Sequence, residues 1–287
     1  MKPYNSLKYF MIFLSILILW VIFQPSLIQA QDLGTKLADE FFMKIHSTEV
    51  DPSMTMDQAV KTQEEFVARL SKELGEPVGY KAGLTNANIQ KILGVTHPIR
   101  GTLLKKMLLE SGATLEGDER LRIEGDLILR VGSDAINQTK TKEEALEYID
   151  AVIPFMELPF IPKPGMKVPE IISFNVFARY GVVGQPIPLT ASEEWMNRLT
   201  NFTVQLIDEK GTVLSEGKGT ALLDDPLNVV LWIKDSLAAG GKKLEKGDLL
   251  SLGSITKMMP SKPGTTVRAI YTDLDPKGPT EISVNFK

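Results

Sequence analysis

A single glutamate in an otherwise apolar run is the feature that most constrains how this chain can fold. Glu157 lies within residues 151–161, and every other member of that run is Ala, Val, Ile, Pro, Phe, Met or Leu. An ionised carboxylate in apolar surroundings loses its hydration, which is costly unless a partner compensates for it. The fold must therefore bring a counter-charge or a cation to a buried position on this segment.

Two further acids precede Glu157 on another segment that predicts a strand. Glu124 and Asp126 lie in residues 121–131, where residues i and i+2 of a strand face the same side. The two carboxylates are expected side by side, where they repel each other unless a cation lies between them. Gly125 leaves room for another group to approach the backbone between them. Three oxygen ligands from two strands indicate a site for a hard metal ion.

The alternative for Glu124 and Asp126 is a charged strand face that meets solvent. Arg122 and Arg130 lie on the same face of the expected strand and would neutralise the two acids. Solvent exposure does not explain the third carboxylate, Glu157, which lies between Met and Leu. We therefore favour the metal site over the solvated face.

Composition limits the kind of protein and the kind of metal. The 287 residues are 43% hydrophobic and 24% charged, as in a globular protein, and the formal net charge of -4 argues against a nucleic-acid partner. Cysteine is absent and there are only two histidines, which excludes zinc-thiolate and multi-histidine sites. Carboxylate ligands remain, and they favour Mg²⁺ or Mn²⁺.

The first thirty residues have the layout of a signal peptide. Lys2 and Lys8 precede an apolar run over residues 9–23, and a small residue, Ala30, precedes Gln31. We expect residues 1–30 to be a signal peptide of an exported protein, periplasmic or extracellular, and residues 31–287 to form a single domain. The alternative is an uncleaved N-terminal membrane anchor; otherwise the mature chain has no membrane contact.

The remaining sequence predicts an α+β fold. Amphipathic periodicity predicts helices over residues 32–47 and 57–74, and Asp225-Pro226 begins a third helix that ends at Ala239 before two glycines. The pair 203–208 and 211–216 predicts a hairpin. Short apolar segments punctuated by Gly and Pro predict further strands in a mostly antiparallel or mixed sheet system; these are residues 78–81, 101–104, 121–131, 152–158, 249–252, 267–271 and 282–286.

The order of these segments resembles a known family. Gly79-Tyr-Lys-Ala-Gly-Leu-Thr85 is similar to the G-[YWH]-K-x-G-L-T segment of the fumarylacetoacetate hydrolase superfamily, and more narrowly to that of 2-keto-4-pentenoate hydratases and 4-oxalocrotonate decarboxylases. Ile123-Glu-Gly-Asp126 falls at the family's pair of metal ligands, and Glu157 falls at the third ligand. Residues 217–228 resemble its pattern of two glycines followed by a leucine and then P-L-N. The resemblance spans residues 57–286.

The resemblance implies a fold, a reaction and a set of roles. The fold is a mixed β-roll with N-terminal helices. The reaction is that of a metal-dependent hydratase acting on a small 2-oxo or 2-hydroxydienoic acid through a metal-stabilised enolate, with a decarboxylase or C–C hydrolase as alternatives. A homo-oligomer is implied as well. The implied residues are Glu124, Asp126 and Glu157 as ligands of Mg²⁺ or Mn²⁺, Lys81 as the catalytic residue, and Thr85, Asn175, Ser254 and Thr256 as substrate contacts.

The chain departs from the family pattern around this metal site. Ile99 stands where the branch carries an acid, with His97 and Arg100 as the nearby polar residues that could replace it, and Phe174 and Phe177 flank Asn175 in place of small or polar residues. These departures favour a more apolar substrate, or an exported binding protein that keeps the metal-chelate pocket without turnover. A β-rich structural protein is a third possibility, but it leaves Glu157 unexplained.

Overall fold

The computed structural model describes residues 32–287. The predicted signal peptide, residues 1–30, lies outside the described residues. None of the helices between residues 32 and 287 combines the length and the apolar character that a membrane crossing requires.

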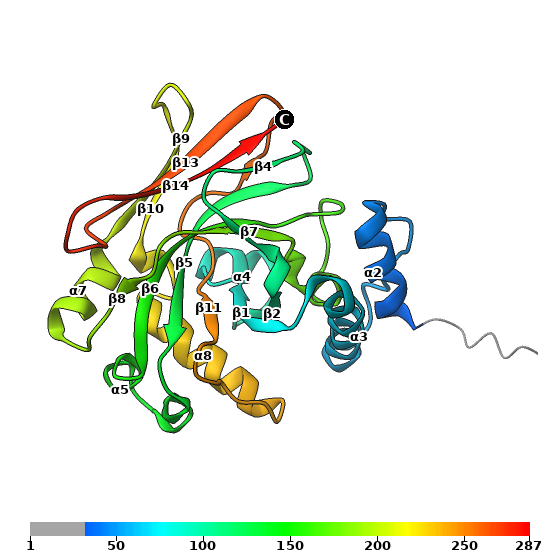
Figure 1. Cartoon of the computed structure of the whole chain (residues 1–287). Coiled ribbons are helices and arrows are strands. Elements are labelled where there is room, and N and C mark those ends of the chain that lie inside the picture. The colour runs from blue at the N-terminus through cyan, green and yellow to red at the C-terminus, as the bar shows by residue number, and fades with distance from the viewer. Residues whose placement is uncertain (1–31) are drawn as a thin grey trace, which may run out of the picture. The chain divides into compact units, whose positions relative to one another are not determined.

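Two helices at the start of the described chain confirm the predicted amphipathic segments. Helix α2 spans Leu33–Met43 and α3 spans Met56–Leu74, and they lie together at one side of the molecule (Figure 1). The Asp32 side chain caps α2, and Thr55 forms a capping box with Gln58 at the start of α3. Their apolar faces join a buried cluster that also covers part of the larger sheet.

The larger sheet has nine strands. They are β1 (Pro77–Gly83), β2 (Ile99–Leu104), β3 (Leu108–Glu110), β5 (Arg122–Val131), β6 (Ile149–Leu158), β7 (Tyr180–Val183), β8 (Ile187–Pro188), β11 (Leu249–Ser251) and β12 (Met259–Pro260). The main order is β2-β1-β11-β5-β6-β7-β3, while β12 pairs with β5 and β8 pairs with β6. Pairs β1–β11 and β3–β7 are parallel and the others are antiparallel, so the sheet is mixed as predicted.

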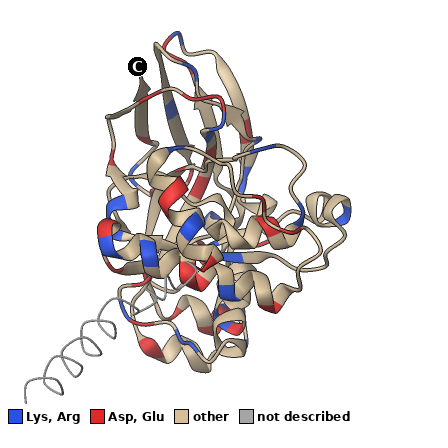
Figure 2. Ribbon diagram, turned by 90° about the vertical axis from the view of Figure 1, so that its right-hand side faces the viewer, with Lys and Arg blue, Asp and Glu red and all other residues tan. Residues whose placement is uncertain are grey.

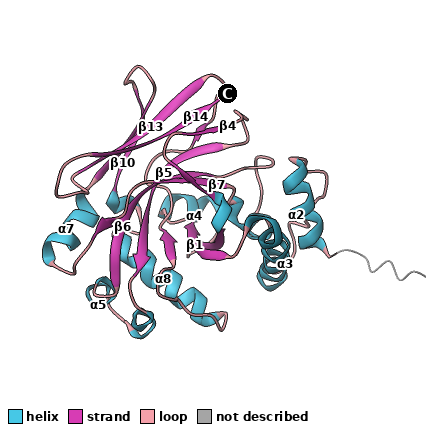
Figure 3. Cartoon of the chain, in the orientation of Figure 1, coloured by secondary structure: helices cyan, strands magenta, loops and turns pink. Residues whose placement is uncertain are grey.

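A five-stranded sheet packs against the larger one. Its strands are β4 (Ala113–Leu115), β9 (Thr203–Ile207), β10 (Val213–Lys218), β13 (Thr265–Thr272) and β14 (Thr280–Phe286), in the order β10-β9-β13-β14-β4. The antiparallel pair β9–β10 is the predicted hairpin. The main apolar core lies between the two sheets and α8 (Pro226–Ala239), the third predicted helix (Figure 3). The α+β class is confirmed.

Several short helices were missed because each spans at most nine residues, which is too few to show a helical period. They are α4 (Ala87–Leu93), α5 (Lys142–Leu146), α6 (Val168–Ser173) and α7 (Glu193–Asn201), together with the single 3-10 turns at Lys105–Met107, Asp134–Gln138, Asn175–Phe177 and Gly219–Ala221.

Strand β5 separates the apolar core from the charged residues. Its odd positions, such as Leu127 and Leu129, pack into the core between the sheets. Its even positions place Glu124 and Asp126 on the opposite face, where both are buried rather than solvated. Arg130 pairs with Asp150 instead of neutralising them. The solvated-face alternative is therefore wrong.

Glu40 on α2 holds that helix to the loop that joins it to α3. Its carboxylate accepts hydrogen bonds from the backbone N–H and the hydroxyl of both Ser47 and Thr48, at 2.5–3.1 Å. Burial alone would raise the pKa of Glu40, but these hydrogen bonds outweigh it and lower the pKa to about 2. The ionised carboxylate therefore stabilises the fold.

We predict that Glu40→Gln lowers the free energy of unfolding by about 1–3 kcal/mol at neutral pH. Because the folded pKa lies below the ordinary 4.5, this contribution is complete above pH 4.5 and is lost as pH falls toward about 2. Urea unfolding across this range measures it. Glu73→Gln, at an exposed acid, is the control. Equal stabilities of wild type and Glu40→Gln at neutral pH would contradict the assignment.

Candidate active site

The three predicted metal ligands lie together on one face of the larger sheet. Glu124 on β5 is paired directly with Glu157 on β6, and Asp126 lies two residues along on the same face. Their exposed fractions are 7%, 2% and 0% respectively. Two glutamates placed opposite each other on neighbouring strands repel, so this pairing needs compensation. Elsewhere the charges are mixed, with basic and acidic residues interspersed over the ribbon (Figure 2).

Lys81 supplies part of that compensation from a distant strand. Its ammonium donates to Glu157 and to the carbonyl oxygen of Val176, the latter at 3.0 Å, and the side chain is 3% exposed. Strands β11 and β5 separate β1 from β6. In a flat sheet those strands would be about 14 Å apart, at roughly 4.8 Å per strand. The contact therefore depends on the curl of the sheet, as in a β-roll.

Asp126 is held by hydrogen bonds from three directions. The backbone N–H of Gly253 donates to its Oδ1 at 2.9 Å, the N–H of Leu127 donates to the same oxygen, and the Ser251 hydroxyl donates to Oδ2. Ser251 is fully buried and lies beside Lys81 in the register of β1 and β11. This serine was missed, because nothing in an apolar Leu-Leu-Ser segment indicates that its hydroxyl faces a carboxylate.

The charges of this cluster do not balance. Three carboxylates and one ammonium leave a net charge of -2 when all are ionised. Burial raises the pKa of Glu124 to about 8, and the adjacent Glu157 carboxylate adds to the rise. Burial and Glu157 also hold the pKa of Asp126 well above its ordinary value, despite the hydrogen bonds it accepts. A buried, all-oxygen site with a deficit of two positive charges is chemically suited to a hard divalent cation.

The side chains are not in a metal-binding arrangement in this structure. Between residues 32 and 287 no three His, Cys, Asp or Glu side chains converge closely enough to hold a metal ion. The hydrogen bonds just described already engage these oxygens. Lys81 donates to one oxygen of Glu157, and backbone N–H groups donate to Asp126. The donors themselves are carboxylate oxygens, the ligands that a hard divalent cation prefers.

Two of the predicted substrate contacts, Ser254 and Thr256, lie in the loop after β11, and a third, Thr85, follows β1. Ser254 lies within hydrogen-bonding range of Glu124, whose pKa it lowers, so it faces the acids. Thr256 accepts from the N–H of Gly125 at 2.9 Å and packs where a Cβ of Gly125 would be, on the face away from the acids. Gly125 therefore admits a supporting residue, as its size predicted. Thr85 is buried against Gly253.

Asn175 is turned toward the backbone of β2. Its side chain accepts from the N–H of Thr102 at 2.7 Å and donates to the carbonyl of Thr102 at 2.8 Å, and it is 0% exposed. The sequence does not predict that the amide oxygen and nitrogen of Asn175 bind these two backbone groups. In this structure the predicted substrate contact is a structural clamp.

The polar residues near Ile99 do not replace the missing acid. Ile99 is buried in the apolar cluster under the N-terminal helices. Arg100 pairs in register with Ala82, so it faces away from Lys81; it stacks on Tyr80 and donates to Ser236 on α8. His97 is exposed. The wall of the site at this position is therefore apolar.

Tyr271 supports the acidic strands from behind and was also missed. Its hydroxyl lies 2.8 Å from the carbonyl oxygen of Asp126 and accepts from the N–H of Phe155 at 3.1 Å, so it bridges β5 and β6 where these two residues pair. The side chain is fully buried, and the pKa of the phenol is raised mainly by burial. No motif distinguishes this tyrosine from an ordinary core residue.

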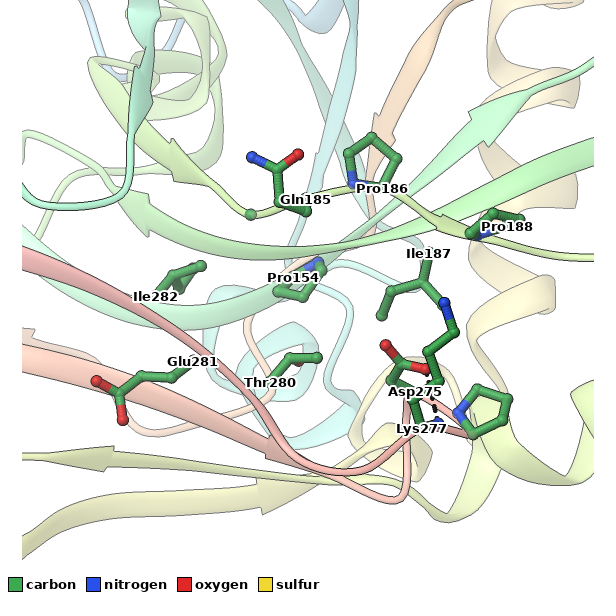
Figure 4. A pocket seen from close by; sticks show the side chains of 12 residues that line it. Pro154, Gln185, Pro186, Ile187, Pro188, Asp275, Lys277, Thr280, Glu281 and Ile282 are labelled. Atoms are coloured by element: carbon green, nitrogen blue, oxygen red, sulfur yellow. Dashed lines mark hydrogen bonds between the residues drawn. The ribbon is translucent and has the colours of Figure 1, made fainter.

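A cavity of about 660 Å³ lies elsewhere, between β8 and the β13–β14 turn (Figure 4). It is lined by residues such as Pro154, Pro186, Ile187 and Ile282, and it includes none of the predicted site residues. The acidic cluster itself is closed to solvent in this structure.

Sequence comparisons relate the chain to known hydratases. It is 27% identical over 218 residues to the 2-keto-4-pentenoate hydratase of Paraburkholderia xenovorans, covering 74% of this chain and 79% of that protein. It is 28% identical over 237 residues to the 2-oxo-hept-4-ene-1,7-dioate hydratase of Escherichia coli, covering 78% and 85%. No protein-family model matches the chain.

Solved structures share the fold. The 4-oxalocrotonate decarboxylase from Pseudomonas putida G7, complexed with magnesium and adipate, matches with a TM-score of 0.73 at 22% identity, over 88% of this chain and 97% of that one. A fumarylpyruvate hydrolase from Pseudomonas aeruginosa, in complex with Mn²⁺ and pyruvate, matches with a TM-score of 0.51 at 14% identity, over 72% and 88%. The predicted β-roll fold is confirmed.

The comparisons correct the expected location. The relatives over most of the chain are hydratases, and none of them is described as exported or membrane-anchored. The prediction of a periplasmic or extracellular protein, with a membrane anchor as its alternative, is therefore wrong. It rested on the local charge and apolar pattern of residues 1–30 alone.

We predict that Glu124→Gln stabilises the metal-free protein at alkaline pH. The folded pKa of Glu124, about 8, lies above the ordinary 4.5, so wild-type stability is highest below pH 4.5 and falls as pH rises through 8. In EDTA the variant should exceed wild type by on the order of 2 kcal/mol at about pH 9. Urea unfolding measures this difference.

In Mn²⁺ the order of stability should reverse, so that wild type is more stable than Glu124→Gln. The cation compensates the charge that destabilises the wild-type site. Glu76→Gln, at an exposed acid, is the control and should be as stable as wild type both in EDTA and in Mn²⁺. If wild type gained stability relative to Glu124→Gln as pH rose in EDTA, the buried-charge account would be contradicted.

Proposed function

We propose that this chain, a member of the hydratase and decarboxylase branch of the fumarylacetoacetate hydrolase superfamily, is a divalent-metal-dependent hydratase of a small 2-oxo acid. It is an enzyme of the type to which its hydratase and decarboxylase relatives belong. The observation that carries the proposal is the buried cluster of Glu124, Asp126, Glu157 and Lys81, which lacks two positive charges.

Glu124, Asp126 and Glu157 are the residues that would hold Mg²⁺ or Mn²⁺. A divalent cation bound there supplies Lewis acidity toward the carboxylate and 2-oxo oxygens of a 2-oxo acid. Solved relatives of the same fold carry magnesium or manganese in their complexes, which supports this choice of metal. The cluster's deficit of two charges supports it independently.

Lys81 is the residue that would move a proton. Its Nζ is almost completely shielded, donates to Glu157 and Val176, and lies on the same face as the acids. A substrate that enters beside the carboxylates replaces one of these two hydrogen bonds and receives the lysine's proton. Ser254, next to Glu124, is placed to donate a hydroxyl hydrogen bond to the same substrate.

The walls of the site suit a substrate with an apolar tail. Ile99, Phe174 and Val176 are buried in one apolar cluster, and the backbone of Val176 accepts a hydrogen bond from Lys81. They exclude water from the charged groups, which strengthens electrostatic interactions there. We propose a 2-hydroxydienoic acid such as the enol of 2-keto-4-pentenoate, whose hydrocarbon end matches these walls.

Decarboxylation is the alternative that Ile99 favours. Hydration requires a base to activate water, whereas loss of carbon dioxide from a 2-oxo diacid requires only charge stabilisation and protonation of the product. The missing acid at Ile99 removes the group expected to assist water addition. Incubation with 2-keto-4-pentenoate and with 4-oxalocrotonate, followed by absorbance and by carbon dioxide release, distinguishes the two reactions; a binding protein would turn over neither.

We predict that Lys81→Met abolishes turnover, by roughly a thousandfold or more, because the proton carrier is lost. Mn²⁺ should bind at least as tightly as in wild type, because the ammonium no longer competes for Glu157. Steady-state kinetics with 2-keto-4-pentenoate and calorimetry with Mn²⁺ measure the two effects.

The matched control is Lys234→Met, at another buried lysine, which lies on α8 and donates to the carbonyl of Thr139. It should retain turnover in proportion to folded protein. Substantial activity in Lys81→Met would remove Lys81 from the mechanism.

A further inference from the structure

The residues that cover Lys81 form a left-handed turn made without glycine. Asn175, Val176 and Phe177 have φ values of 52°, 52° and 60°. Such angles are uncommon for residues other than glycine, and a β-branched valine there is a genuine outlier. Strain of this kind persists only where surrounding contacts over-determine the conformation, and it concentrates at functional sites.

Two glycines let this turn lie directly on the strands that carry and flank Lys81. A Cβ on Gly83 would lie 2.6 Å from Cγ1 of Val176. A Cβ on Gly101 would lie 2.7 Å from the carbonyl oxygen of Asn175 and 3.0 Å from Cγ of Lys81. Gly101 pairs in register with Lys81, so the turn, Gly101 and the lysine stem are in mutual contact.

The Asn175 side chain fixes the turn to the same place. Its two hydrogen bonds join the N–H and the carbonyl of Thr102, the residue that follows Gly101. The next carbonyl along the turn, that of Val176, then accepts from Lys81 Nζ at 3.0 Å. The chain of contacts therefore runs from β2 through Asn175 and the turn to the lysine.

We propose that Asn175 is a positioning residue, which holds the left-handed turn so that the Val176 carbonyl directs Lys81 Nζ at the carboxylates. It acts through the turn and does not touch the substrate. The role of Lys81 rests on the function proposed above, whereas the position of Lys81 can be measured without turnover.

The test compares Asn175→Gly with a matched variant. Glycine adopts the left-handed angle without strain, so this change removes the clamp and leaves the backbone conformation accessible. Asn137 makes the same kind of clamp, accepting from the N–H of Leu244 at 2.9 Å and donating to its carbonyl at 2.8 Å. Asn137→Gly therefore removes equivalent hydrogen bonds elsewhere.

The readout is the rate at which acetic anhydride acetylates Lys81, followed by peptide mass spectrometry and divided by the rate at Lys234, another buried lysine. We expect Asn175→Gly to raise this ratio by about tenfold, the factor that roughly 1.4 kcal/mol of lost positioning gives. Asn137→Gly should leave it at the wild-type value. An unchanged ratio in folded Asn175→Gly, or an equal rise in both variants, would overturn the proposal.

Gly101→Ala is the second variant, and it decides the matter if Asn175→Gly does not fold. Its Cβ would push the backbone of the turn and the lysine stem apart, although the Asn175 side chain itself is kept. The labelling ratio should rise as well, and no rise would overturn the proposal.

Kinetics with 2-keto-4-pentenoate add a separate readout. In Asn175→Gly, kcat should fall while KM stays within about twofold of wild type, because positioning acts on the chemical step. A rise in KM with unchanged kcat would instead assign Asn175 to substrate binding. If wild type shows no turnover, the proposed function fails, and the labelling ratio still tests the positioning role.

Discussion

The burial of three carboxylates beside one ammonium is the constraint on which the rest of this structure depends. Glu124 and Glu157 face each other across β5 and β6, and Asp126 adds a third charge at 0% exposure. Such a cluster is unstable when fully ionised without a cation, as the raised pKa values of Glu124 and Asp126 indicate. The curl of the sheet brings Lys81 to Glu157 and relieves part of this instability.

The surrounding elements hold this cluster in place from several sides. The five-stranded sheet contributes Tyr271, which bridges β5 and β6 behind Asp126. The last residue of β11, Ser251, supplies a hydroxyl donor to Asp126, and Gly253 just after the strand supplies a backbone donor. On the face of the acids, the turn containing Asn175 and Val176 covers Lys81, which is buried. The left-handed residues cost about 1–2 kcal/mol each, a sum that the packing of the turn must offset.

The sequence predicted the groups of the site better than their orientations. Alternation on β5 and the isolated Glu157 were sufficient to place the acids, and the Gly79–Thr85 segment located Lys81. Whether Asn175 faces substrate or the backbone of Thr102 depends on a tertiary contact that no local pattern encodes. Likewise, Asn-Val-Phe contains no glycine to indicate a left-handed turn, and Ser251 and Tyr271 resemble ordinary core residues. The export prediction failed because it used only a local leader-like pattern.

The most direct measurement is calorimetry of Mg²⁺ and Mn²⁺ binding to the protein, with and without oxalate, which imitates the carboxylate and enolate oxygens of a bound 2-oxo acid. The account predicts one metal site per chain, tighter binding in the presence of oxalate, and loss of both in Glu157→Gln. Absence of metal binding in wild type under both conditions would contradict it, and the three buried acids would then have no role in a metal-dependent reaction.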